Sequence, residues 1–239
     1  MTPKILSFEA SAFNNLPSIE SADNHVRTTK KLEIALNILG PIFIKHQMFR
    51  SWGLTLLHNH FKLEQGELPI QDIGVKKSEK TYITTPRFSS YEKEFFPAVL
   101  HVQSANNLIP LEFSTDCSAL IANEELMKNP EFVTDLYHSL VENDLIANFG
   151  LIYGKIVNSS YGLVELNYEG RISRLTEVKN NDISNMKNLI QTSWFFSPKI
   201  NGTNCVPNNC LSYCEKDSQG NHQNGHSQPY HDPGVKITN

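Results

Sequence analysis

Residues 52–63 read WGLTLLHNHFKL, and the next four residues, 64–67, read EQGE. The first segment is the most apolar strand-like run of the chain, and Gly66 in the second segment suits a tight turn. Side chains at positions i and i+2 of a strand point to the same face of the sheet. The sequence therefore predicts a strand over 52–63 on which the imidazoles of His58 and His60 stand side by side.

Two imidazoles that project together are the beginning of a metal site. Glu64 or Glu67 can add an oxygen ligand, which gives the two-histidine, one-carboxylate set that suits zinc(II), iron(II) or manganese(II). His101 lies in another apolar segment, 98–102, and becomes a third imidazole ligand if its strand neighbours the first. The alternative is that these histidines are half-buried residues bonded to their neighbours, because most histidines bind no metal.

The order of residues in this part of the chain resembles the first cupin motif. That motif runs Gly, several residues, His-x-His, three or four residues, Glu and then Gly. The matching residues are Gly53, His58, His60, Glu64 and Gly74. The gap between the first glycine and the first histidine is one residue shorter than in the motif, and the last glycine comes later. The second cupin motif, Pro-x-Gly followed by a further His and Asn, is not found downstream, so the resemblance is confined to residues 53–74.

The rest of the chain mixes hairpin and helix patterns. A helix is expected to begin at Pro130, with Asn129 as its N-cap and an apolar stripe at helical spacing behind it. Residues 97–103 and 108–113 read as the two strands of a hairpin, and the Gly-Pro pair at 40–41 is expected to end an earlier helix. We therefore expect an α+β fold with a mainly antiparallel sheet and two or three packed helices.

Composition divides the chain into three regions. Residues 1–24 are expected to form a loosely ordered arm and residues 25–196 the α+β core domain. Residues 197–239 have few large aliphatic side chains and cannot bury enough apolar surface to fold unaided. This polar, Cys/His-rich tail is expected to be disordered or organised by zinc, with a disulfide as the remaining alternative. The candidate tail ligands are Cys205, Cys210, Cys214, His222 and His226, followed by His231.

Cys117 stands just before a segment, 118–127, that is expected to be helical. A thiol at a helix N-terminus has a lowered pKa, which is one way in which cysteine nucleophiles are activated. With His101 or His138 as the base, Cys117 is the candidate catalytic residue of a Cys-dependent hydrolase or transferase. The alternative is an ordinary buried core cysteine.

Charge and hydropathy narrow the function classes. The net charge of −4 and the pI near 6.1 argue against a nucleic-acid partner, which favours basic surfaces. No apolar run is long enough for a membrane span or a signal peptide, so we expect no membrane partner and a cytoplasmic location. The leading hypothesis is a metal-binding protein, and its more specific version is a metalloenzyme that uses the strand histidines. The alternative is a non-catalytic binding module whose C-terminal tail contacts a protein partner.

Overall fold

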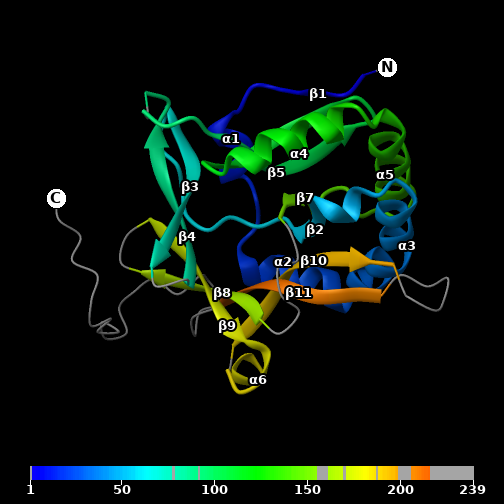
Figure 1. Ribbon diagram of the computed structural model, residues 1–239. Helices are drawn as coiled ribbons and strands as arrows, with labels where there is room; N and C mark the ends of the chain where they lie inside the picture. Colours follow the sequence, from blue (N-terminus) through cyan, green and yellow to red (C-terminus); the bar gives the residue numbers. More distant parts are fainter. Residues whose placement is uncertain are drawn as a thin grey trace.

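Ten strands close into a β-barrel in the computed structural model, which describes residues 2–76, 79–90, 92–154, 161–168, 171–186, 188–198 and 206–215 (Figure 1). Round the barrel the strands follow the order β6 (Asn107–Ser114), β3 (Glu67–Lys76), β4 (Glu79–Phe88), β9 (Ile172–Lys179), β8 (Tyr161–Tyr168), β11 (Val206–Glu215), β10 (Leu189–Ser197), β2 (Trp52–Leu56), β7 (Phe149–Tyr153) and β5 (Phe96–Ser104). Strand β5 also pairs with β6, and this pairing closes the ring. A short strand, β1 (Lys4–Ile5), pairs with β6 outside the ring.

Six α-helices and one 3-10 helix accompany the barrel in the described part of the chain. They are α1 (Ala10–Asn14), α2 (Ile19–Thr28), α3 (Lys31–Lys45), η1 (Met48–Arg50), α4 (Cys117–Met127), α5 (Pro130–Glu142) and α6 (Asn180–Ile183). Helix α3 packs against α5 and β10, and α4 runs along β5 (Figure 1). Helices α2 to α5 share one buried apolar cluster with β2, β5, β7 and β10, so the main core lies between these helices and the strands that they cover.

No helix within the described ranges is long and apolar enough to span a membrane.

Two helix predictions have different outcomes. The helix expected from Pro130 is confirmed: α5 begins there, and Asn129 Oδ1 accepts a hydrogen bond from the Phe132 amide at 3.2 Å. The expected end of the earlier helix at the Gly-Pro pair is wrong, because α3 continues to Lys45 with Pro41 inside it. Phe43, beyond the proline, is fully buried, and this packing compensates for the backbone hydrogen bond that proline cannot donate.

The predicted α+β fold with a mainly antiparallel sheet and two or three packed helices is wrong, because the sheet closes into a barrel and six α-helices accompany it in the described part of the chain. Three of its pairings, β1 with β6, β3 with β6 and β8 with β11, are parallel. Parallel neighbours come from distant segments, whereas hairpin patterns in a sequence report only on consecutive strands. The polar segment assigned to the tail supplies β11, which lies between β8 and β10. The segment treated as an arm holds β1, α1 and the start of α2, and its Phe13 and Ile19 are fully buried.

Gly150 on β7 allows β5 to approach closely. A Cβ atom at this position would lie 2.6 Å from the Leu100 carbonyl oxygen and 2.8 Å from the Leu57 side chain. We expect Gly150→Ala to lower the free energy of unfolding by about 1–3 kcal/mol, because the neighbouring backbone must shift. The control is Gly74→Ala, where the nearest atom is at an ordinary 3.8 Å. Urea unfolding of both variants gives the comparison, and equal stability losses would contradict the prediction.

Glu67 on β3 and Arg171 just before β9 form a bidentate ion pair. Arg171 Nη2 donates to Glu67 Oε1 at 2.9 Å, and Nη1 donates to Oε2. These bonds hold the pKa of Glu67 below its ordinary value. Such a carboxylate stabilises the fold above its unfolded-state pKa of about 4.3, and this contribution is lost as the pH falls through the lower folded-state pKa.

We therefore expect Glu67→Gln to be less stable than the wild-type protein near neutral pH. The difference should shrink as the pH falls below about 4, since the wild-type carboxylate then becomes protonated. Urea unfolding of both proteins across this pH range measures it. Glu64→Gln is the control, because the Glu64 side chain is 74% exposed and lies 3.7 Å from Arg171. A stability difference that is independent of pH would refute the linkage.

Candidate metal centre

The predicted strand over 52–63 is shorter than expected, because β2 ends at Leu56. His58 and His60 therefore lie in the connection that follows this strand. The connection that carries them is fixed at Asn59, whose amide donates to the Pro17 carbonyl at 3.0 Å and whose side chain donates to the Leu16 carbonyl at 2.6 Å. The two imidazole ring centroids are 4.7 Å apart. The rings are therefore neighbours, but an anchored loop brings them together and not the pleat of a strand.

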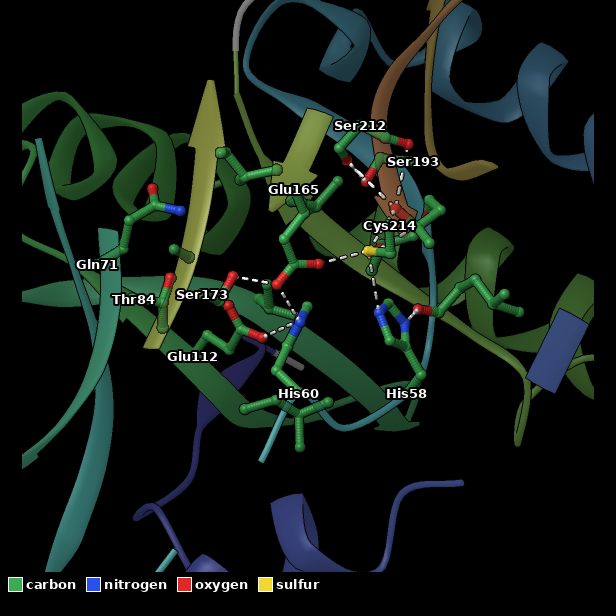
Figure 2. Close-up of a pocket in the computed structure, with 18 of the residues that line it drawn as sticks. His58, His60, Gln71, Thr84, Glu112, Glu165, Ser173, Ser193, Ser212 and Cys214 are labelled. Atoms are coloured by element: carbon green, nitrogen blue, oxygen red, sulfur yellow. Dashed lines mark hydrogen bonds and ion pairs between the residues drawn. The ribbon is translucent and has the colours of Figure 1, made fainter. Parts of the chain in front are cut away.

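The two imidazoles meet a glutamate from β8 and a cysteine from β11 (Figure 2). His58, His60, Glu165 and Cys214, which we call the four-residue group, each offer one ligand atom, and these atoms all lie within 4.8 Å of one another. Cys214 Sγ is 2.6 Å from Glu165 Oε2 and 3.5 Å from His58 Nε2. His60 Nδ1 is 2.8 Å from Glu165 Oε1. The group can hold a metal ion.

Acceptors outside the group fix the orientation of both rings. His58 Nδ1 is 2.8 Å from the Leu56 carbonyl oxygen, which can only accept, so the proton lies on Nδ1 and Nε2 faces the group. His60 Nε2 is 3.1 Å from Glu112 Oε1, so Nδ1 faces the group. Ser173 donates a hydrogen bond to Glu165 Oε1. Carbonyl or carboxylate partners of this kind orient the histidine ligands of metals in proteins.

Two pKa shifts describe the electrostatics of this group. For His60, burial opposes the charged form, but the Glu165 and Glu112 carboxylates outweigh it and raise the pKa well above its ordinary value. For Cys214, burial and then the charge of Glu165 raise the pKa of the thiol. A thiolate at Cys214 therefore needs a positive charge beside it, which a metal ion held by the group would supply.

A cavity of about 70 Å³ adjoins the four-residue group inside the barrel. Its wall is unusually polar for a protein interior and includes Thr55, Gln71, Thr84, Glu112, Ser173 and Ser212. Figure 2 shows most of these side chains converging on the same space from different strands. A ligand bound in this cavity would contact both the group and several hydrogen-bonding side chains.

The other predicted ligands of the core site lie outside the four-residue group. The Glu64 side chain is largely exposed and lies near Arg171. His101, on β5, has its Nε2 3.0 Å from the Ile146 carbonyl oxygen, and burial lowers its pKa. Neither Glu64 nor His101 contributes to the group that the fold brings together.

Cys117, the candidate catalytic residue, is exposed at the first position of α4, after the capping residue Asp116.

The tail candidates have different locations. Cys214 belongs to the four-residue group, and Cys210 lies on β11, with its side chain outside the described part. Cys205, His222, His226 and His231 lie outside the described residues.

Sequence reasoning did not identify Glu165 and Glu112 as site residues. Each is an isolated acidic residue in an otherwise apolar strand segment, LVEL at 163–166 and LIPLEF at 108–113. Glu165 is 1% exposed, which is rare for a carboxylate without a partner of opposite charge. A single acidic residue inside an apolar strand was therefore the signal that could have indicated them.

No protein-family model matches this chain, and comparisons with curated proteins and with solved structures also find no match.

Proposed function

We propose that this protein is a metalloenzyme that holds one divalent transition-metal ion, zinc(II) in the first place, on the four-residue group. The ligand atoms would be His58 Nε2, His60 Nδ1, a Glu165 oxygen and Cys214 Sγ. The single observation that carries the proposal is the orientation of the two imidazoles. Their outer nitrogens face the Leu56 carbonyl and Glu112, so that both inner nitrogens face a buried carboxylate and a buried thiol.

The distances within the group support a small tetrahedral ion. Ligand atoms around zinc, with bonds of about 2.0–2.3 Å, lie roughly 3.3–3.8 Å from one another. The 3.5 Å between Cys214 Sγ and His58 Nε2 falls in this range. The contacts of Glu165 with Cys214 and His60, at 2.6 and 2.8 Å, are hydrogen-bonding distances, so Glu165 would move outward by somewhat less than 1 Å on coordination.

The donor types favour zinc over the other two metals. A thiolate is a soft ligand, and with two imidazoles it suits zinc better than manganese, which prefers oxygen ligands. Iron(II) sites of the two-histidine, one-carboxylate type have no thiolate among their protein ligands. Zinc therefore fits Cys214 best.

The adjoining cavity supports an enzyme over a purely structural site. Structural zinc ions are enclosed by four protein ligands and packed side chains, whereas catalytic ions keep a position for water or substrate. Here the group borders a cavity lined by polar residues. Exchange of the Glu165 carboxylate for water would give the ion this position, and the released carboxylate would lie beside the water as a base.

Metal analysis of untagged protein tests the proposal. We expect about one zinc ion per chain in the wild-type protein and less than a tenth of that in Cys214→Ser, because serine is a poor zinc ligand. Cys117→Ser is the matched control, since Cys117 is an exposed cysteine outside the group, and it should keep the ion.

A shortened variant that ends after Glu215 distinguishes a metal ion on the four-residue group from one bound by the tail residues. If the ion is lost from that shortened chain and retained by Cys214→Ser, the ligands lie among the tail residues and the proposal is wrong. Circular dichroism of each variant shows that the fold is retained, so that metal loss is not a result of unfolding.

A further inference from the structure

A second, larger cavity of about 290 Å³ lies next to the one beside the four-residue group. The two cavities share five lining residues, namely Gln71, Ile152, Tyr153, Leu175 and Ser212. Its volume is close to the lower end of the range of about 300–1,000 Å³ that small-molecule sites occupy. A small organic ligand in the larger cavity would therefore reach toward the group through a common wall.

The larger cavity has an apolar part and is nearly uncharged. Ile73, Leu163 and Phe195 form the apolar part, beside neutral polar residues that include Ser114, Ser118 and Tyr82, and among its described lining residues Asp116 is the only acidic one and none is Lys or Arg. Asp116 already accepts hydrogen bonds from the Tyr153 hydroxyl at 2.8 Å and from the Ser118 amide at 2.9 Å. An anion would find no positive partner on this wall, and a cation would compete with bonds that are already made. The wall thus favours a neutral ligand.

Two polar side chains, one on the wall shared by the cavities and the other beside it in the smaller cavity, are available for a ligand. Gln71 on β3 and Thr84 on β4 are directly paired across the two strands, and both line the cavity beside the group (Figure 2). Thr84 is only 3% exposed. Neither side chain makes a hydrogen bond to any residue in the described part of the chain. Because Thr84 is buried and Gln71 is partly buried, and buried polar groups are normally paired, these two side chains are suited to a hydroxyl or carbonyl group of a ligand.

We propose that the larger cavity binds a small neutral molecule with an aromatic or branched alkyl body and one hydroxyl or carbonyl group. The apolar body lies among Phe195, Leu163 and Leu175. The polar group is held by Gln71 and Thr84, where it is directed toward the four-residue group. Binding itself needs no metal ion, whereas the approach of the polar group to an ion rests on the proposed function.

Benzyl alcohol is the probe for this inference, and toluene, benzoate and benzylamine are its comparison molecules. Calorimetric or NMR titration of the full chain, both zinc-loaded and chelator-treated, should give saturable binding of benzyl alcohol. We expect at least tenfold weaker binding of the two charged molecules, because neither finds a partner of opposite charge that is free to pair. Benzoate or benzylamine that binds as tightly as the alcohol, or an alcohol that does not bind, overturns the inference.

Substitutions of Gln71 and Thr84 test the two hydrogen-bonding residues. Gln71→Leu and Thr84→Val should each weaken benzyl alcohol binding at least fivefold and change toluene binding less than twofold, since toluene has no polar group. Gln103→Leu is the matched control, because Gln103 is an exposed glutamine on β5. Equal losses for the alcohol and for toluene would show that these residues shape the cavity without binding the polar group, which contradicts the assignment.

Replacement of zinc by cobalt(II) tests the metal site and the ligand site separately. The visible absorption of a cobalt–thiolate centre should shift when benzyl alcohol is added, and an unchanged spectrum with bound alcohol overturns the orientation toward the ion. If cobalt does not bind to the group, the metal proposal fails. In that case, alcohol binding to the metal-free protein still supports the larger cavity as a ligand site.

Discussion

Removal of the bound zinc ion is expected to lower the melting temperature of the protein by roughly 8–16 °C. An ion that binds only the folded state stabilises it by about 4 kcal/mol when its free concentration is about 1,000 times the dissociation constant. For a chain of this length, each kcal/mol corresponds to about 2–4 °C in melting temperature. The ion would bind the folded state alone because its ligands come from distant segments, among them Glu165 on β8, which is 1% exposed, and Cys214 on β11.

Calorimetry of zinc-loaded and chelator-treated protein measures this shift, with the metal content of each sample determined separately. The variant Cys214→Ser serves as the control, and its melting temperature should be nearly the same with and without chelator. If the wild-type protein loses one ion per chain and its melting temperature does not change, the ion is not coordinated by buried residues of the barrel. That result would move the metal site to the surface or the tail.

Local sequence patterns predicted the parts of this fold that form locally. The hairpin expected over 97–103 and 108–113 is confirmed by β5 and β6, which pair from Phe96 to Ser104. Helix α5 is confirmed because its cap at Asn129 and its first turn at Pro130 are both visible in consecutive residues. The order of the strands round the barrel could not be predicted in this way, because the bonds of β11 to β8 and of β3 to β6 join distant segments and leave no periodic signal.

The candidate site was predicted in part for the same reason. His58 and His60 are two residues apart, so their proximity follows from the sequence itself. Cys214 is 156 residues from His58 and 49 residues from Glu165 in the sequence, so its proximity to them leaves no local signal. Composition assigned Cys214 to a polar tail. Within the polar segment, residues 206–215 form β11, and Ser212 and Cys214 on this strand line the polar cavity. Low hydrophobicity of a segment therefore does not exclude a strand whose side chains face a polar interior.

Helix α3 is joined to the barrel by a buried aromatic contact. Phe43 on α3 is fully buried, and its ring centroid lies 5.1 Å from that of Phe132 on α5 and 5.0 Å from that of Phe196 on β10. One side chain therefore joins two helices to a barrel strand. The same strand carries Thr192 and Ser193, which line the cavity beside the four-residue group, so this contact also supports the wall of the site.

We expect Phe43→Ala to lower the free energy of unfolding by about 3–5 kcal/mol, because it leaves a cavity where three aromatic rings now meet. Val141→Ala on α5 is the control; Val141 is 46% exposed, and its loss should change stability by less than about 0.5 kcal/mol. Urea unfolding followed by tryptophan fluorescence suits both variants, since Trp194 lies on β10 beside this contact. A loss of less than about 1 kcal/mol for Phe43→Ala would mean that the barrel holds its shape without its helices, because an independent barrel would be insensitive to a cavity in their interface. A loss of the expected size means that the contact of α3 with α5 and β10 contributes to the stability of the whole fold.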